Sequence, residues 1–365
     1  MIVFIYGTTA EAIKLAPIAR RLDARGIPYE HWVTQQHTDA LRVAMPQLGF
    51  RAPDRVIANG WRGKPLKTPL QMLGWMFDVG IWTLRNLRSI RKSLPRNSVV
   101  IVHGDTVTTV LGTFIGRLAG APVAHVEAGL RSGDWRHPFP EELDRRIVGR
   151  LAQIHYAPAE EAAANLAGRA NVVMTHGNTV VDAVRDAAAG RSVVADEEYG
   201  LVLLHRFEFI SNPQLVRDTL VALDQESPLP MKVVVDSYSR DTMERTIASL
   251  GLQKFTIMAK QEHSEFVDTL RAAAFIVTDS GGVQEEAAVF GLPTLVHRMA
   301  TERSEGIGTT AMLSLWDLNR VREFLRSTDA HRGSNTADPR SPSDIVVDDL
   351  VDRGLAQPGS GAACA

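Results

Sequence analysis

The stretch Phe275-Ile-Val-Thr-Asp-Ser-Gly-Gly-Val-Gln-Glu-Glu286 decides the fold class, because it joins three signals in one short segment. The apolar run 275–278 predicts a buried strand, Ser-Gly-Gly predicts a tight turn, and the residues that follow begin a helix. Glycines let a backbone approach a ligand closely, and the free amides of a helix N-terminus favour phosphate. An ordinary strand-to-helix turn also needs glycine, so a tight turn is the alternative to an anion site.

The same alternation of short apolar strands and helical patterns fills the chain, as in parallel sheets covered by helices. The strands are expected at 2–6, 30–33, 99–103, 122–126, 154–157, 171–175, 201–204, 232–235, 255–258, 275–278 and 294–296. We predict an α/β protein with two Rossmann-like, doubly wound domains and a ligand cleft between them. Turn residues at Thr175-His-Gly-Asn178 place the domains at 1–174 and 175–330. A short helix is expected at about 341–354 and a disordered tail at 357–365.

Composition excludes several classes of protein. The chain has 365 residues, 45% of them hydrophobic and 22% charged, which is typical of a globular protein. Forty basic residues against forty-two acidic ones leave no field for a polyanion, so nucleic acid is not an expected partner. The single cysteine, Cys364, fits a reducing cytoplasm.

The apolar segments of the chain predict no membrane association. The N-terminal segment 1–6 predicts a first buried strand rather than a secretory signal. The apolar stretch 70–84 is broken by Asp78 and falls short of the ~20 residues that cross a bilayer. We therefore expect a core or dimer helix there.

Polar residues after strands carry the candidate chemistry, because doubly wound sheets bind ligands outside the carboxyl ends of their strands. His103 and Asp105 follow one predicted strand, and Glu127 and Arg131 follow the next. The two carboxylates would face one cleft. Alternatively, Asp105 caps a helix and Glu127 pairs with Arg131. His103, Asp105, His125 and Glu127 could also hold a metal, but strand alternation alone places such pairs on one face, and we expect none.

Two further segments add candidate charges. Pro138-Phe-Pro-Glu-Glu142 opens a helix, where the dipole favours Glu141 in the first turn and Arg145 lies one turn later. The prolines stiffen the approach to this carboxylate. His205 and Arg206 follow the 201–204 strand, where a cationic pair could neutralise a diphosphate, although a lone histidine there is more often packed in the core.

The remaining candidates surround the Ser-Gly-Gly turn. Glu286 lies one turn into the helix, suited to bond sugar hydroxyls, and Arg298, Glu302 and Arg303 continue the polar rim unless they form a solvated loop. Gly7-Thr-Thr lacks the second and third glycines of a dinucleotide fingerprint, and it lacks the lysine of a P-loop. NAD and ATP are therefore disfavoured.

Over nearly its whole length the chain resembles the non-hydrolysing UDP-N-acetylglucosamine 2-epimerases. The matching motifs, in chain order, are Gly7-Thr-Thr-Ala-Glu-Ala-Ile-Lys-Leu-Ala-Pro17, His103-Gly-Asp-Thr106, His125-Val-Glu-Ala-Gly-Leu-Arg131, Pro138-Phe-Pro-Glu-Glu142, Gly177-Asn-Thr-Val-Val-Asp182, His205-Arg206 and Asp279-Ser-Gly-Gly-Val-Gln-Glu-Glu286.

The resemblance implies a glycosyltransferase-B arrangement, with the C-terminal helix returning to the first domain, and a homodimer. It implies cofactor-free inversion at C2 of UDP-GlcNAc to give UDP-ManNAc. The carboxylates implied for acid/base work are Asp105, Glu127 and Glu141, with His205 beside the diphosphate. The implied substrate-binding residues are Lys14, Arg131, Arg145, Arg206, the diphosphate cradle Ser280, Gly281 and Gly282, the ribose ligand Glu286, and Arg303.

Several positions depart from the family pattern, and two of them bear on the diphosphate. Thr9 stands where the family has arginine, and Phe207 where it often has a second arginine after His205-Arg206. Losing two guanidiniums should weaken diphosphate binding or alter the preferred nucleotide or sugar. The rival hypotheses are a glycosyltransferase or nucleotide-sugar hydrolase that uses C1 chemistry only, and a catalytically altered binding homologue.

Overall fold

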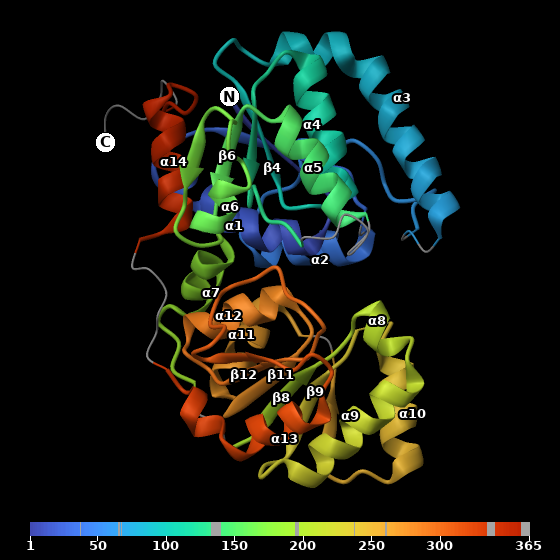
Figure 1. The fold of residues 1–365 in the computed structure, drawn as a ribbon. Helices are drawn as coiled ribbons and strands as arrows, with labels where there is room; N and C mark the ends of the chain where they lie inside the picture. Colours follow the sequence, from blue (N-terminus) through green and yellow to red (C-terminus); the bar gives the residue numbers. More distant parts are fainter. Residues whose placement is uncertain are drawn as a thin grey trace. The chain divides into compact units, whose positions relative to one another are not determined.

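The fold consists of two α/β units, each described by itself. The computed structural model describes residues 1–36, 38–64, 66, 68–132, 140–193, 197–236, 238–259, 261–333 and 340–358. Unit 1 comprises Met1–Ala183 and Asp338–Ala365, and unit 2 comprises Val184–Ala337. Within each unit, helices cover a parallel sheet (Figure 1). The predicted class of two Rossmann-like, doubly wound domains is confirmed.

Unit 1 is built on a seven-stranded sheet of order β3-β2-β1-β4-β5-β6-β7. Its strands are β1 (Ile2–Tyr6), β2 (Tyr29–Val33), β3 (Arg55–Val56), β4 (Val99–His103), β5 (Val123–Val126), β6 (Ile154–Ala157) and β7 (Val172–Met174). The central strand β1 is buried on both faces: Phe4 and Tyr6 belong to one core cluster, and Val3 and Ile5 to the other. This two-sided burial explains its unbroken apolar sequence.

Helices cover both faces of this sheet. They are α1 (Thr9–Ala24), α2 (Thr38–Gln47), α3 (Pro69–Ser93), α4 (Val107–Ala119), α5 (Glu141–Leu151), α6 (Glu160–Ala164) and α14 (Pro342–Asp352), while α7 (Val180–Ala188) crosses the division between the units. The helix α14 inserts Val346, Val347 and Leu350 into the core cluster that α1 lines with Leu15 and Ile18. The C-terminal helix therefore completes the core of unit 1.

Unit 2 is built on a six-stranded sheet of order β10-β9-β8-β11-β12-β13. Its strands are β8 (Gly200–Leu203), β9 (Met231–Val234), β10 (Phe255–Met258), β11 (Phe275–Thr278), β12 (Thr294–Val296) and β13 (Ala311–Leu313). Its helices are α8 (Phe207–Ile210), α9 (Pro213–Glu226), α10 (Arg240–Leu250), α11 (His263–Ala272), α12 (Gly281–Val289), α13 (Leu318–Arg326) and the 3₁₀ turn η1 (Thr328–His331). Alternate residues of β11 pack into separate core clusters, Val277 on one face and Ile276 on the other.

The structure corrects two details of the sequence prediction. The edge strands β3 and β13 were not predicted, because such short segments show no periodicity of their own. The division between units falls inside α7 rather than at Thr175, because the intervening residues contact unit 1: Asn178 binds Glu127, and Asp182 accepts the Ser343 N–H.

Two further findings concern membrane-spanning helices and the C-terminal tail. None of the helices in the described ranges is long and apolar enough to cross a bilayer. The predicted tail begins in described residues, but its part from 359 onward lies outside them.

Candidate active site

Each sheet changes its winding direction at one point, and several of the candidate residues follow the strands beside it. In unit 1 this switch lies between β1 and β4, and in unit 2 between β8 and β11. Open α/β sheets bind ligands beside the carboxyl ends of the strands at such a switch. Asp105 follows β4, while His205 follows β8 and Ser280 follows β11. The strand-end reasoning from the sequence therefore located the same positions.

Glu127 is the most constrained of the predicted carboxylates. It follows β5, is only 5% exposed, and has a φ of 67°, a left-handed conformation that costs a non-glycine residue roughly 1–3 kcal/mol. Lys14 Nζ lies 2.5 Å from Glu127 Oε2, Asn178 donates to the same oxygen, and His103 Nε2 lies 3.9 Å away. Such strain persists only where surrounding contacts enforce it, and it is concentrated at functional sites.

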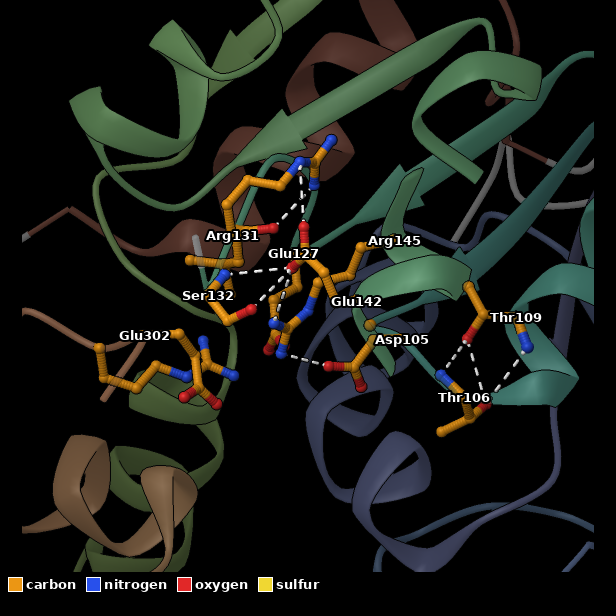
Figure 2. Close-up of polar contacts among 12 residues, drawn as sticks. Asp105, Thr106, Thr109, Glu127, Arg131, Ser132, Glu142, Arg145 and Glu302 are labelled. Atoms are coloured by element: carbon orange, nitrogen blue, oxygen red, sulfur yellow. Dashed lines mark hydrogen bonds and ion pairs between the residues drawn. The ribbon is translucent and has the colours of Figure 1, made fainter. Parts of the chain in front are cut away.

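Asp105 is held by Arg145, whose guanidinium crosses from α5 to the β4–α4 loop (Figure 2). The guanidinium is buried and the carboxylate is partly exposed. The alternative helix-capping role does not fall to Asp105, because Thr106 Oγ1 accepts the Thr109 N–H at 3.2 Å and caps α4. Asp105 is thus left at the surface of the switch point with a cation behind it.

Glu11 joins the two loops of this switch point. Its Oε2 accepts the N–H groups of Gly7 and Thr8 at 3.0 and 2.9 Å, and its Oε1 accepts Thr106 Oγ1 at 2.8 Å. Burial raises the pKa of this carboxyl, although the hydrogen bonds from Gly7 and Thr106 oppose the rise. Glu11 therefore fixes the loop before α1, the helix that carries Lys14, to the loop that carries Asp105.

Helix α5 contributes further charged groups. Glu141 is its first residue, while 138–139 of the predicted Pro-Phe-Pro motif lie outside the described residues. Arg131 lies 3.9 Å from Glu142, which also accepts the Ser132 N–H at 3.1 Å (Figure 2). The alternative pairing of Arg131 with Glu127 is therefore wrong, since Lys14 occupies that carboxylate.

Asp144 was not singled out from the sequence. Its Oδ2 is buried with no hydrogen-bond partner among the described residues. Burial, together with the charges of Asp105 and Glu141, raises the pKa of Asp144 to about 7. The sequence signal for Asp144 was its position three residues after Glu141 on one helix, which brings the two carboxyl groups to the same face. This signal became informative only because α5 also packs beside Asp105.

The four residues considered for a metal do not gather around one point. His125 Nε2 lies 2.7 Å from the Gly104 carbonyl oxygen, and burial lowers the pKa of this histidine to about 4. No group of three or more potential ligands suited to a metal ion occurs in the described parts of the chain.

In unit 2, Asp279 organises the cationic loop after β8. This carboxylate is buried, and it accepts the backbone N–H groups of His205 at 3.0 Å and Arg206 at 2.9 Å. Burial raises the pKa of Asp279, and the nearby His205 charge and the two N–H bonds lower it, with a net upward shift. Asp279 belongs to one of the matching motifs, but it was not predicted as a site residue. Its position as an acidic residue directly after a strand is the signal that could have identified it.

The Ser-Gly-Gly turn begins α12 as predicted. Ser280 is the N-cap, and its Oγ accepts the Val283 N–H at 3.4 Å. Gly282 has no left-handed φ, and a Cβ added there would approach Ser280 Oγ no closer than 3.8 Å. The fold therefore does not require glycine at 282, whereas close approach of a ligand would.

The rest of α12 supports the neighbouring loop. Gln284 Nε2 donates to the carbonyl oxygens of Arg303 and Glu305, and Glu285 forms a buried 2.9 Å pair with Arg303 Nη1. Arg303 lies against Gly281, where an added Cβ would be 3.2 Å from Arg303 Cγ. Glu286 Oε1 lies 3.4 Å from His263 Nε2. Arg303 thus supports the turn from behind, and ligand contact by this residue stays a prediction.

The structure groups the predicted residues into two sets, one on each unit. Unit 1 carries Lys14, Asp105, Glu127, Arg131, Glu141 and Arg145, and unit 2 carries His205, Arg206, Ser280, Gly281, Gly282, Glu286 and Arg303. The first set is rich in carboxylates with fixed cations, as acid/base chemistry needs. The second combines cations with a helix N-terminus, a combination that binds anions.

The chain is similar to known proteins over most of its length. A family model described as UDP-N-acetylglucosamine 2-epimerase matches residues 82–329. The UDP-N-acetylglucosamine 2-epimerase of Escherichia coli (strain K12) is 32% identical over 350 residues, covering 88% of this chain and 89% of that protein. The enzyme of that name from Yersinia pestis is 31% identical over 341 residues, covering 87% of each.

Solved structures agree with the sequence matches. The UDP-GlcNAc 2-epimerase from Neisseria meningitidis, bound to UDP-GlcNAc, has a TM-score of 0.78 at 25% identity, covering 96% of this chain and 99% of that one. The S. aureus MnaA–UDP co-structure has a TM-score of 0.78 at 28% identity, covering 97% of both chains. The ordered motifs, the two doubly wound sheets and these matches together mean that the chain belongs to the UDP-N-acetylglucosamine 2-epimerase family.

Proposed function

We propose that this protein is a nucleotide-sugar 2-epimerase that interconverts UDP-GlcNAc and UDP-ManNAc, or close analogues, without a cofactor. The observation that carries the proposal is Glu127, a buried carboxylate held in a strained backbone conformation between Lys14 and Asn178. Strained backbone conformations cluster at functional sites, which supports a functional role for this carboxylate. The relatives of this family carry the same activity in their names.

The proposed reaction needs proton transfer at C2 and departure of UDP from C1. A carboxylate removes the C2 proton as the C1–O bond to UDP breaks, which gives 2-acetamidoglucal and UDP. UDP then adds back to C1 while an acid protonates C2 on the opposite face. Because two faces take part, more than one carboxylate is needed, and we assign Asp105, Glu127 and Glu141 to these steps. Each acid/base role contributes about 10²- to 10⁴-fold.

The leaving diphosphate needs fixed positive charge, which we assign to unit 2. The amides at the start of α12 and the side chains of His205 and Arg206 supply this charge beside the β8–β11 switch point. Oxyanion donors of this kind contribute roughly 3–4 kcal/mol each. The position of Gly282, where the fold leaves room for a side chain, supports a phosphate close to the backbone.

We further propose that the enzyme is a cytoplasmic homodimer that pairs through α3. This helix exposes a row of large apolar side chains, among them Leu70 (79%), Leu73 (60%), Phe77 (68%) and Leu84 (71%). Apolar rows of this size are typical of a protein–protein interface. The cytoplasmic assignment rests on the single cysteine of the sequence.

Hydrogen exchange at C2 tests the proposed reaction directly. NMR of the purified enzyme with UDP-GlcNAc in D2O should show deuterium at C2 in both epimers. Release of UDP that depends on an acceptor or on water, without C2 exchange, would favour a transferase or hydrolase. Tight binding with neither turnover nor exchange across UDP-, GDP-, CDP- and dTDP-sugars would identify a binding homologue.

A thermal-shift screen of nucleoside diphosphates addresses the base and complements the exchange experiment. A ligand at about 100 times its dissociation constant stabilises the fold by roughly 2.7 kcal/mol. We expect UDP to give the largest shift.

A further inference from the structure

Asp236 lies beside His205, although neither the motifs nor the proposed reaction assign it a role. His205 Nδ1 is 3.5 Å from Asp236 Oδ2, and His205 Nε2 is 3.9 Å from Asp279 Oδ1. The three residues follow the neighbouring strands β8, β9 and β11. The imidazole therefore has a carboxylate near each ring nitrogen, at the edge of the sheet assigned to the diphosphate.

The Asp236 carboxylate is oriented by its own loop. Its Oδ1 accepts the N–H groups of Tyr238 at 2.9 Å and Ser239 at 2.7 Å, and the Ser239 hydroxyl at 2.9 Å. This Asx-type turn holds one carboxylate oxygen and turns the other, Oδ2, toward His205. A carboxylate so restrained orients its partner without the entropic cost of ordering a flexible side chain.

The charged groups around His205 favour its cationic form. Burial opposes protonation, but contact with Asp236 and the charges of Asp279 and Asp236 outweigh it and raise the pKa of His205, against a smaller opposing effect of Arg206. Arg298, from the loop after β12, adds a cation beside Arg206 and Asp279. Burial would raise the pKa of Asp236, but the His205 contact and the Ser239 bonds hold it far below its usual range.

We propose that Asp236 is a positioning residue that holds the Nδ1 edge of a cationic His205 and leaves Nε2–H to donate to the diphosphate of the substrate. Asp279 is beyond hydrogen-bond distance of Nε2, so that N–H can turn to a phosphate oxygen. The ligand part of this inference rests on the proposed function. The coupling between Asp236 and His205 does not.

The test compares Asp236→Asn with the exposed control Asp241→Asn on α10. An asparagine keeps the Oδ1 acceptor of the turn but removes the charge from His205. We expect the NMR titration of His205, assigned with His205→Gln, to move at least one pH unit lower, and each unit weakens UDP binding by up to about tenfold at a pH above both titration midpoints. At pH 5.5 the UDP affinity of the variant should lie close to that of the native protein. The Asp241 variant, which removes only an exposed ion pair with Arg245, should change neither property.

The double variant separates positioning from a general effect on the fold. In a His205→Gln background, Asp236→Asn should change UDP affinity by less than about twofold, because coupled residues are not additive. An unchanged His205 titration, or an equal loss of affinity with and without His205, would overturn the proposal. A native protein with a shifted His205 titration but no UDP binding would leave the coupling intact and refute the proposed function instead.

Discussion

At the scale of single residues, the proposed function assigns proton transfer to unit 1 and anion binding to unit 2. The carboxylates lie on unit 1 with cations fixed behind them, Lys14 at Glu127 and Arg145 at Asp105. The cations and amides for an anion lie on unit 2. Negative carboxylates and a diphosphate repel one another, so a working site must keep them at different ends.

This separation predicts two classes of variant. Asp105→Asn and Glu141→Gln should keep the fold and most of the UDP affinity but lose C2 exchange by several orders of magnitude, because neither residue is assigned to the phosphate. His205→Ala should weaken UDP binding and turnover together. Isothermal titration with UDP and NMR exchange in D2O measure the two properties separately. Near-normal exchange in both carboxylate variants would show that the chain shares the fold without this chemistry.

Gly282 offers a sharper test of the diphosphate cradle. Gly282→Ala should leave the melting temperature unchanged or slightly higher, since a helical Gly→Ala change stabilises by about 0.4–1 kcal/mol where the conformation is compatible. The added methyl group would make only an ordinary van der Waals contact with Ser280 Oγ, at 3.8 Å, so any clash is with the ligand. We expect at least tenfold weaker UDP binding. Unaltered affinity would place the diphosphate elsewhere.

At the scale of elements, α14 is held to unit 1 by polar contacts with Asp182 as well as by its apolar face. Asp182 is 1% exposed, and it accepts the Ser343 N–H at 2.8 Å and Ser341 Oγ at 2.9 Å. Arg21 lies 3.6 Å from the other oxygen of Asp182. The helix N-terminus and α1 are therefore fixed to one buried carboxylate.

Removal of this carboxylate should loosen α14. We expect Asp182→Ala to lower the free energy of unfolding by about 1–3 kcal/mol, because it leaves a buried donor without its acceptor. Asp348→Ala, which removes a largely exposed pair with Arg25, should cost at most about 1 kcal/mol. Urea unfolding followed by circular dichroism distinguishes the two. Equal effects would mean that the contacts of Asp182 stabilise the fold no more than a surface ion pair does.

The exposed face of α3 provides the second prediction at this scale. Phe77→Lys should convert the proposed homodimer to a monomer in light scattering at micromolar concentration, because it places a charge on an apolar interface. The change lies on the exposed face, so the monomer should unfold with an ordinary cooperative transition. A native protein that is already monomeric would refute the dimer, and an unchanged dimer would place the interface on another surface.

At the scale of the whole molecule, buried histidines distributed over both units make stability depend on pH. Burial lowers the pKa of His31, His125, His155 and His297 to about 4 each. The unfolded chain binds protons near pH 6.5 while these folded side chains stay neutral, so their contribution is complete above about pH 6.5 and is lost as pH falls toward 4. Asp144, with its raised pKa, contributes in the opposite direction between about pH 7 and 4.

The buried histidines and Asp144 change stability in opposite directions as the pH falls. The informative quantity is therefore the difference in the free energy of unfolding between a variant and the native protein. His31 packs among aromatic rings that include Tyr29 and Phe50, so His31→Phe keeps an aromatic ring there and removes the titration. As the pH falls from about 6.5 to 4, the free energy of unfolding of this variant should rise steadily relative to that of the native protein. Urea midpoints across that range measure the gain, with His331→Asn, at a half-buried position on η1, as the control. A constant difference would mean that His31 titrates normally.

The sequence by itself determined the class of fold and the positions of the candidate groups. Strand periodicity located the central strands, as at 2–6 and 275–278, because burial on both faces requires unbroken apolar residues. The rule that ligands bind at strand ends then picked out Asp105, Glu127 and His205. The order of the motifs further indicated the family. All of these are local patterns, readable from neighbouring residues.

Tertiary structure alone decided which groups meet. Lys14 and Glu127 are far apart in sequence, and they pair because β1, which precedes α1, lies beside β4 and close to β5 in the sheet. The positive φ of Glu127 and the contact between Asp236 and His205 depend on strand order and loop geometry in the same way. A side-chain contact requires two backbones to be positioned within a few ångströms, and the packing of the sheet and its helices sets that distance, which no local pattern encodes.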